Sequence, residues 1–252
     1  MSGIQRQIAT IPKTVKKLRR RRSKGLARGA DDPSGHRYRF LPRLREKTVS
    51  RFEREYDLKL PEDYRYFLIH VGNGGTGPGY GLFPLPIGKR PRRLPRFGSR
   101  HLTTGESYVP ELGDLRQPFP WTHAVTLDED WPWERWEELP GVIVLAHQGC
   151  ACFWFLVVRG PAYGTVWDDG SGADEKLQPT GKSFVDWYWE WLDSRLDDFG
   201  ARPLWLWQTS PSRGDAVSRE VARCPECGRP NSVRTQVCPR CGTRTPGRRE
   251  EG

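Results

Sequence analysis

Four cysteines near the C-terminus have the residue type and spacing of a metal site. Cys224 and Cys227 form one Cys-x-x-Cys pair, Cys238 and Cys241 form a second, and a glycine follows each pair. Each such turn directs two thiolates at one point, and two turns complete a tetrahedron. We therefore predict that these four cysteines hold one structural Zn²⁺ ion, with no open position for a catalytic water.

Two alternatives to zinc use the same cysteines. Iron binds four thiolates with the same ligand chemistry, and the cysteines could instead form two disulfides. Disulfides are disfavoured because no apolar signal segment follows Met1. The remaining pair, Cys150 and Cys152, is spaced i and i+2 along an apolar run, which predicts two buried free thiols on one strand.

The sequence carries no recognisable catalytic pattern. The five histidines have no ligand-like spacing, and the adjacent carboxylates Asp128, Glu129 and Asp130 would diverge on one loop. The Gly-rich segment 72–79 follows a predicted helix and leads into an extended run, whereas a phosphate loop needs strand, loop and helix in that order. We predict that the chain is not an enzyme.

The elements that must position any site are predicted from apolar periodicity. Helical stripes occur within 41–58, 60–71 and 183–196, and Asn73, Gly74 and Gly75 are typical of a helix end. Extended apolar runs cover 142–146, 151–158 and 164–167, with a further extended segment at 80–85. Short turns between these runs indicate a mostly antiparallel sheet, so the predicted fold class is α+β.

The stretch LPEDYRYFLIHVGNGGTGPGYGLFPL, together with the later Val-Trp-Asp strand end, carries a resemblance to a known family. From Leu41 to Leu196 the chain resembles the SUKH (Smi/Knr-like) superfamily, which includes cell-wall-assembly regulators and bacterial toxin-immunity proteins. The resemblance implies a central, mostly antiparallel sheet flanked by helices. It also implies a non-enzymatic protein-binding module, whose partner would be a cognate toxin of the nuclease or deaminase class.

Charge is distributed unevenly along the chain. Residues 1–30 carry ten Lys or Arg and no acid, residues 31–209 sum to −4, and the remainder sums to +4. Such a basic run with few apolar residues predicts a disordered tail over 1–37. The expected domains are that tail, a SUKH domain at 38–205, a linker at 206–220 and a zinc ribbon at 221–246.

Partner-binding residues are predicted from loops and exposed aromatics. The candidates are Asn73, Gly74, Gly75 and Tyr80 in the Gly-rich loop, and Trp131, Trp133 and Trp136 in an acidic segment. No apolar run is long enough for a membrane span, so we expect a cytoplasmic protein without a membrane partner.

The alternative function is a nucleic-acid-associated regulatory or adaptor protein. Its basic ends would make weak nucleic-acid contacts, in part through arginines of the ribbon at positions 223, 229, 234, 240 and 244. No aromatic residue lies between Cys224 and Cys241 to stack on a base, which weakens a single-strand interpretation.

Overall fold

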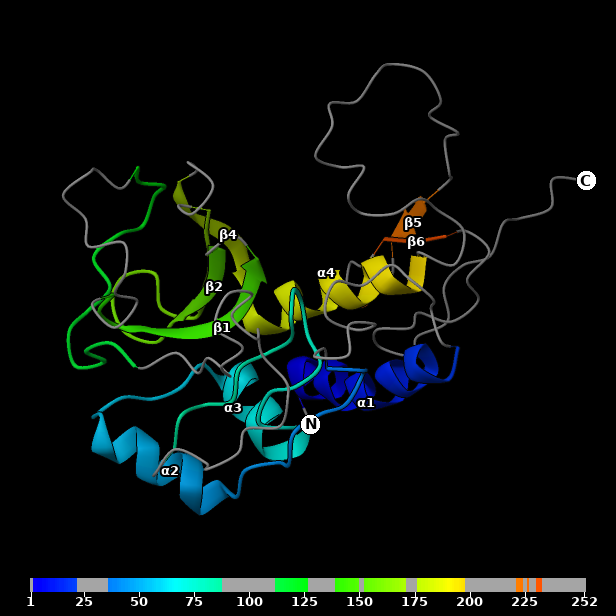
Figure 1. Ribbon diagram of the computed structural model, residues 1–252, viewed down its shortest axis with the longest axis horizontal. Coiled ribbons are helices and arrows are strands. Elements are labelled where there is room, and N and C mark those ends of the chain that lie inside the picture. The colour runs from blue at the N-terminus through cyan, green and yellow to red at the C-terminus, as the bar shows by residue number, and fades with distance from the viewer. Residues whose placement is uncertain are drawn as a thin grey trace, which may run out of the picture.

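A four-stranded antiparallel sheet forms the centre of the computed structural model (Figure 1). The structure describes residues 2–21, 36–87, 112–126, 139–149, 152–170, 176–197, 221–223, 226 and 230–232. The strands are β1 (Val142–Gly149), β2 (Cys152–Val157), β3 (Thr165–Asp169) and β4 (Leu177–Ser183), and they pair in sequence order. The α+β class is therefore confirmed.

Both faces of the sheet are buried, which explains why its first two strands are nearly continuous apolar runs. On one face Leu145, Leu156 and Val166 join the core that contains the helices. On the other face Val144, Phe155 and Trp167 form a second core. Segments outside the strands, through Phe83, Phe119 and Leu139, cover that second face.

Three helices correspond to the predicted stripes: α2 (Glu46–Glu55), α3 (Glu62–His70) and α4 (Phe184–Asp197). The Phe67 ring of α3 packs 5.1 Å from Phe184 and 5.3 Å from Tyr188, both on α4. Ser183 caps α4, because its Oγ accepts the Asp186 N–H at 3.3 Å. Figure 1 shows α4 running beside the sheet, with α3 next to it.

Two parts of the sheet differ from the prediction. Strand β4 was not predicted, because Pro179 and Gly181 interrupt its polar sequence; as an edge strand it tolerates both, with a register shift beside the Trp167–Pro179 pair. The segment 80–85 is not a full strand. Only Leu82 is paired there, bridging Gly75 on one side and Ala146 of β1 on the other.

The prediction of a disordered tail over 1–37 is wrong for residues 3–21, and residues 22–35 lie outside the described part of the chain. Gly3–Arg21 forms helix α1, which packs against α3 and α4. Its residues Ile8, Ile11, Val15 and Leu18 lie on one side and are buried in the helix-facing core. Burial of this stripe outweighs the mutual repulsion of the basic residues, because those side chains point into water instead.

No helix within the described residues is long and apolar enough to cross a membrane.

Candidate functional site

The Gly-rich loop after α3 is a backbone junction within the fold. Gly74 and Gly75 are buried and have φ of +88° and +99°. A Cβ on Gly75 would lie 2.5 Å from the Arg39 carbonyl oxygen, so only glycine fits between its neighbours. Its backbone forms β-bridges with Phe40 and with Leu82. Because Leu82 also bridges Ala146 of β1, these residues continue the hydrogen-bonded ladder beyond the edge of β1.

Asn73 and Tyr188 hold the same loop in place. The Asn73 side chain is half-buried, and its Oδ1 accepts the Leu85 N–H at 2.9 Å. The buried Tyr188 hydroxyl of α4 donates to the Thr76 carbonyl oxygen at 2.8 Å. Three of the predicted partner-binding residues, Asn73, Gly74 and Gly75, therefore have structural contacts that fix the loop on α4 and on the sheet.

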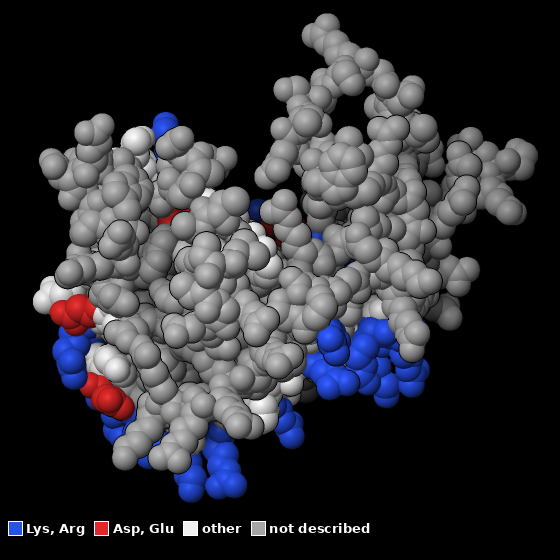
Figure 2. All heavy atoms as spheres, viewed as in Figure 1, with Lys and Arg blue, Asp and Glu red and all other residues white. Residues whose placement is uncertain are grey.

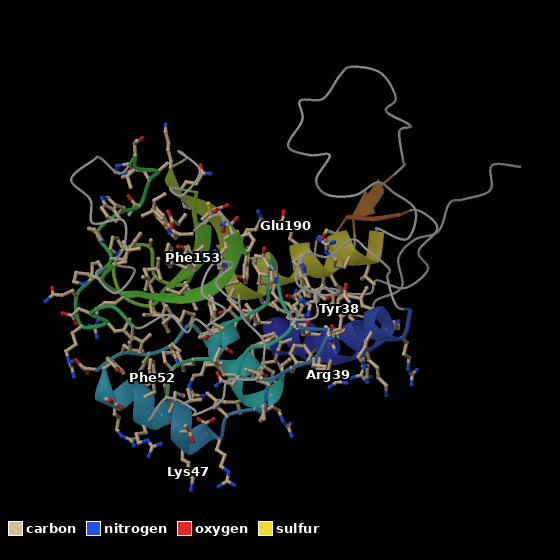
Figure 3. The ribbon with its side chains drawn as sticks, viewed as in Figure 1. Tyr38, Arg39, Lys47, Phe52, Phe153 and Glu190 are labelled. Carbon is tan, nitrogen blue, oxygen red and sulfur yellow. The ribbon has the colours of Figure 1, made fainter. Side chains whose placement is uncertain are left out.

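Tyr80, the fourth loop candidate, lies against the end of the sheet. Its N–H donates to the His147 carbonyl oxygen at 3.0 Å, and its ring stacks on the His147 ring at 5.4 Å. His147 stacks in turn on Phe153 of β2 at 4.6 Å. Tyr80 and His147 are half-buried, whereas Phe153, labelled on the sheet in Figure 3, is buried. The result is an aromatic stack with one partly exposed end.

Polar groups lie beside this stack. The Gln148 side-chain amide donates to the Phe153 carbonyl oxygen at 3.0 Å and to the Asp168 carboxylate of β3. We call the half-buried set Tyr80, His147, Gln148 and Asp168 the sheet-end surface. Phe153 faces the second core, whereas Asp168, opposite Trp154, lies on the helix-facing side, so the set draws on both faces of the sheet at one end. It combines a partly exposed ring stack with polar groups, which suits recognition of a partner. Sequence reasoning identified Tyr80 alone, because the other three lie on strands whose pairing brings them together.

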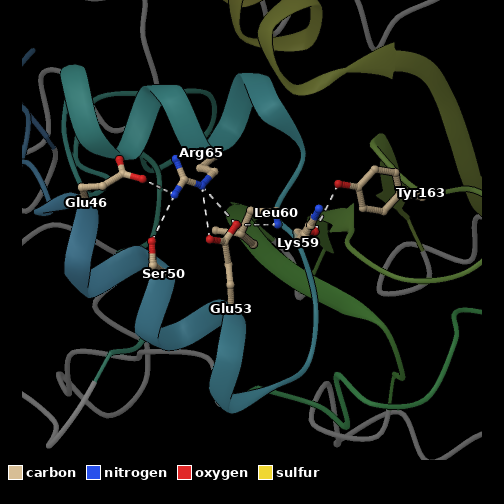
Figure 4. Close-up of polar contacts among 7 residues, drawn as sticks. All are labelled: Glu46, Ser50, Glu53, Lys59, Leu60, Arg65 and Tyr163. Carbon is tan, nitrogen blue, oxygen red and sulfur yellow. Dashed lines mark hydrogen bonds and ion pairs between the residues drawn. The ribbon is translucent and has the colours of Figure 1, made fainter.

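A second polar constellation joins α2 to α3. The Arg65 guanidinium of α3 contacts Glu46, Ser50 and Glu53 of α2, with distances of 3.1 and 3.2 Å to the two Glu53 oxygens (Figure 4). The Glu53 Oε1 also accepts the Leu60 N–H at 3.1 Å. The hydrogen bond from Arg65 lowers the pKa of Glu46. These contacts run between neighbouring helices, so we assign them a positioning role. No local pattern in the sequence predicts them.

The remaining predicted site residues lie outside the described residues. They are the four cysteines of the proposed metal site and the three tryptophans, Trp131, Trp133 and Trp136. Within the described part of the chain, no group of three or more His, Cys, Asp or Glu side chains could hold a metal ion. Of the other two cysteines, Cys152 is a buried thiol rather than half of a disulfide, as predicted, and Cys150 is not described.

A small hairpin brackets the first cysteine pair in sequence. Strands β5 (Val221–Arg223) and β6 (Pro230–Ser232) pair antiparallel, with Arg223 opposite Pro230. The pairing holds together the two ends of the segment that includes Cys224 and Cys227. Cys224 and Cys227 themselves lie outside the described residues.

Comparison with known proteins places the chain in a family. The SMI1 / KNR4 family (SUKH-1) matches residues 43–189, which is more than half of the chain. The chain therefore belongs to this family, whose members are generally non-enzymatic and typically bind proteins. No curated protein and no solved structure matches it. Helix α1 and the cysteine-bearing C-terminal segment both lie outside the matched residues.

Proposed function

We propose that this chain is a non-enzymatic immunity protein of the SUKH type, which neutralises a bacterial toxin of the nuclease or deaminase class by direct binding. The observation that carries this proposal is membership of the SMI1/KNR4 family over residues 43–189. The charge of residues 31–209, −4 in sum, complements a basic nuclease and would speed association with it.

The sheet-end surface is the proposed contact region. Tyr80 supplies a partly exposed ring held in place by its stacking on His147, and a pre-positioned aromatic ring loses little conformational freedom on binding. Gln148 and Asp168 supply polar groups at the rim. Trp131, Trp133 and Trp136 remain proposed contributors from the sequence.

A pull-down with the tagged full-length chain tests the proposal in the native host. We expect one stoichiometric protein partner that survives nuclease treatment and is lost with Tyr80→Ala. The matched control is Tyr163→Ala, because Tyr163 is a more exposed tyrosine in the β2–β3 turn, at the opposite end of these strands. Circular dichroism of both variants would verify that they fold.

A neutralisation assay follows the pull-down. Expression of the captured protein alone should stop growth, and co-expression of this chain should restore it. A captured protein that is harmless on its own would contradict the immunity assignment. A set of nucleic-acid-binding proteins that disappears on nuclease treatment would favour the alternative, a nucleic-acid-associated regulatory or adaptor protein.

We further propose that Cys224, Cys227, Cys238 and Cys241 hold one structural zinc ion. The repeated Cys-x-x-Cys-Gly pattern supports this, as does the β5–β6 pairing around the first pair. In so short a segment, metal binding rather than a hydrophobic core would supply the folding free energy. When bound, the ion would cross-link the two turns.

Elemental analysis of the purified full-length chain tests the metal site. We expect one zinc per chain, and less than a tenth of that in the double variant Cys238→Ser, Cys241→Ser. Cys150→Ser, which removes a cysteine outside the set, should keep the metal. One equivalent of iron would identify an iron site, and a metal-free chain without titratable thiols at these positions would indicate disulfides.

A further inference from the structure

Helix α1 is built into the folded body in a fixed orientation. The Ser2 Oγ accepts the Gln5 N–H and the Gln5 Oε1 accepts the Ser2 N–H, both at 3.2 Å, so a capping box begins the helix. Ile8, Ile11, Val15 and Leu18 are buried against a core shared with α3 and α4. The opposite side of α1 must therefore face away from that core.

That opposite side is basic. Arg6, Lys13, Lys17 and Arg20 follow one another at steps of seven, four and three residues, with Lys16 beside them, and all five are exposed. We call these five residues the α1 basic face. At 1.5 Å per helical residue it extends over about 21 Å. Helix α1 contains no Asp or Glu.

The charges of the α1 basic face are not neutralised within the described structure. None of the five side chains takes part in an ion pair or a hydrogen bond there. Figure 2 shows Lys and Arg gathered along the edge of the molecule beneath α1, and a second group beneath α2. The exposed Arg39, labelled in Figure 3, comes from the segment before α2. The basic residues of α1 therefore form one exposed group, separate from the group on α2.

The chemistry of the face selects its ligand. Protein interfaces usually have an apolar or aromatic centre and are depleted in Lys, whereas the α1 basic face contains neither an aromatic nor a large aliphatic residue. Insertion into a membrane would need the apolar side of α1, which is already buried. Single-stranded nucleic acid would need exposed rings for base stacking. A row of exposed cations without rings suits the phosphates of a duplex.

We propose that the α1 basic face binds the phosphate backbone of double-stranded nucleic acid, without sequence preference. Each phosphate that it neutralises releases condensed counterions, so affinity should fall steeply with salt. This activity is separate from the proposed toxin binding, because it uses residues outside the family match and a different part of the molecule from the sheet-end surface.

Fluorescence anisotropy with a labelled DNA duplex of about 20 base pairs and the full-length chain tests the proposal. In the variant Lys13→Glu, Lys16→Glu, Lys17→Glu, Arg20→Glu we expect binding at low salt to weaken by at least about tenfold. The slope of log K against log salt concentration should decrease in magnitude by about 3. A single strand of equal length should bind the wild type less tightly than the duplex.

A control variant with the same change in net charge separates the effect of the α1 basic face on duplex binding from the effect of net charge. The variant Arg51→Glu, Arg54→Glu, Lys59→Glu, Lys176→Glu reverses four exposed cations outside α1 and should bind within about threefold of the wild type. Equal weakening in both variants would overturn the proposal, as would unchanged binding by a folded α1 variant. Tighter binding to the single strand than to the duplex would overturn the proposal too. So would the absence of duplex binding together with an acidic protein partner that binds the wild type and not the α1 variant. If the reversal variant does not fold, Lys13→Gln, Lys16→Gln, Lys17→Gln replaces it, with weakening expected in the same direction.

Discussion

At the scale of single residues, Asp63 joins two helices through one buried carboxylate. Its Oδ2 accepts the Val185 N–H at 2.9 Å, at the start of α4, while its Oδ1 accepts the Tyr64 N–H at 2.8 Å within α3. Desolvation by burial raises the pKa of Asp63, and these hydrogen bonds oppose that shift. The carboxylate also faces the positive end of the α4 dipole.

We expect Asp63→Ala to lower the free energy of unfolding by about 2–3 kcal/mol, because it leaves the buried Val185 N–H without an acceptor. Glu62→Ala is the matched control, since Glu62 is exposed in the same first turn of α3 and should cost less than about 0.5 kcal/mol. Urea unfolding followed by tryptophan fluorescence measures both. If both variants lost the same free energy of unfolding, the Asp63 carboxylate would have no special role in joining the helices.

His36 makes folding stability depend on pH. Its ring is fully buried against Tyr38 and Trp191, and its Nδ1 accepts the Tyr38 N–H at 3.0 Å. Desolvation by burial lowers the pKa of His36 from 6.5 to about 3; a weaker backbone hydrogen bond involving Gly77 opposes the shift, and the charge of Arg195 adds to it. Between these two values the unfolded chain binds a proton that the folded chain does not.

The stability contributed by neutral His36 is therefore complete above pH 6.5 and is lost as pH falls toward about 3. We expect His36→Gln to remove a slope of up to about 1.4 kcal/mol per pH unit from the wild-type unfolding free energy in this window. Denaturation series at several pH values measure the difference between the two proteins. An exposed histidine changed in the same way, His123→Gln, should leave the slope as it is.

At the scale of elements, α1 contributes to the core through a single stripe. Ile11 is fully buried within that stripe, whereas Ile4, at the start of the same helix, is 39% exposed. We expect Ile11→Ala to lower the free energy of unfolding by about 2–5 kcal/mol, from lost transfer free energy and the cavity left behind. Ile4→Ala should change it by less than about 0.5 kcal/mol. A small effect of Ile11→Ala in equilibrium unfolding would mean that α1 is detached in solution.

Periodicity predicted the elements whose apolar residues repeat. Helices α2, α3 and α4 and strands β1, β2 and β3 were all predicted, with ends displaced by a few residues. Helix α1 was missed because its charge run outweighed two signals that were present, the Ser2–Gln5 capping box and the stripe at 8, 11, 15 and 18. Strand β4 has no such pattern, because a polar edge strand is positioned by the partner that it pairs with.

The candidate site was only partly predictable. The glycines at 74 and 75 indicated positive φ and a chain reversal, and the structure has both. The aromatic stack of Tyr80 on His147 depends on a contact between residues 67 positions apart, which no local pattern encodes. The same holds for the Asp168–Gln148 contact, since the register of three strands decides it.

At the scale of the whole molecule, the folded body begins earlier than the family match. The four buried aliphatic residues of α1 share one core with α3 and α4, and each such side chain is worth roughly 1.5–3 kcal/mol when buried. Removing residues 1–37 should therefore expose apolar surface and lower the free energy of unfolding by at least about 3 kcal/mol, since partial repacking recovers some of the loss. Removing residues 206–252 should change the same transition by less than about 1 kcal/mol, because a segment that folded around the proposed zinc ion would not depend on this core. Chemical unfolding of the full-length, 1–205 and 38–252 chains measures both effects.

A 38–252 chain as stable as the full-length protein would mean that α1 contributes positive charge but no stability to the folded body. A 1–205 chain that fails to fold would mean that the C-terminal segment packs as part of it.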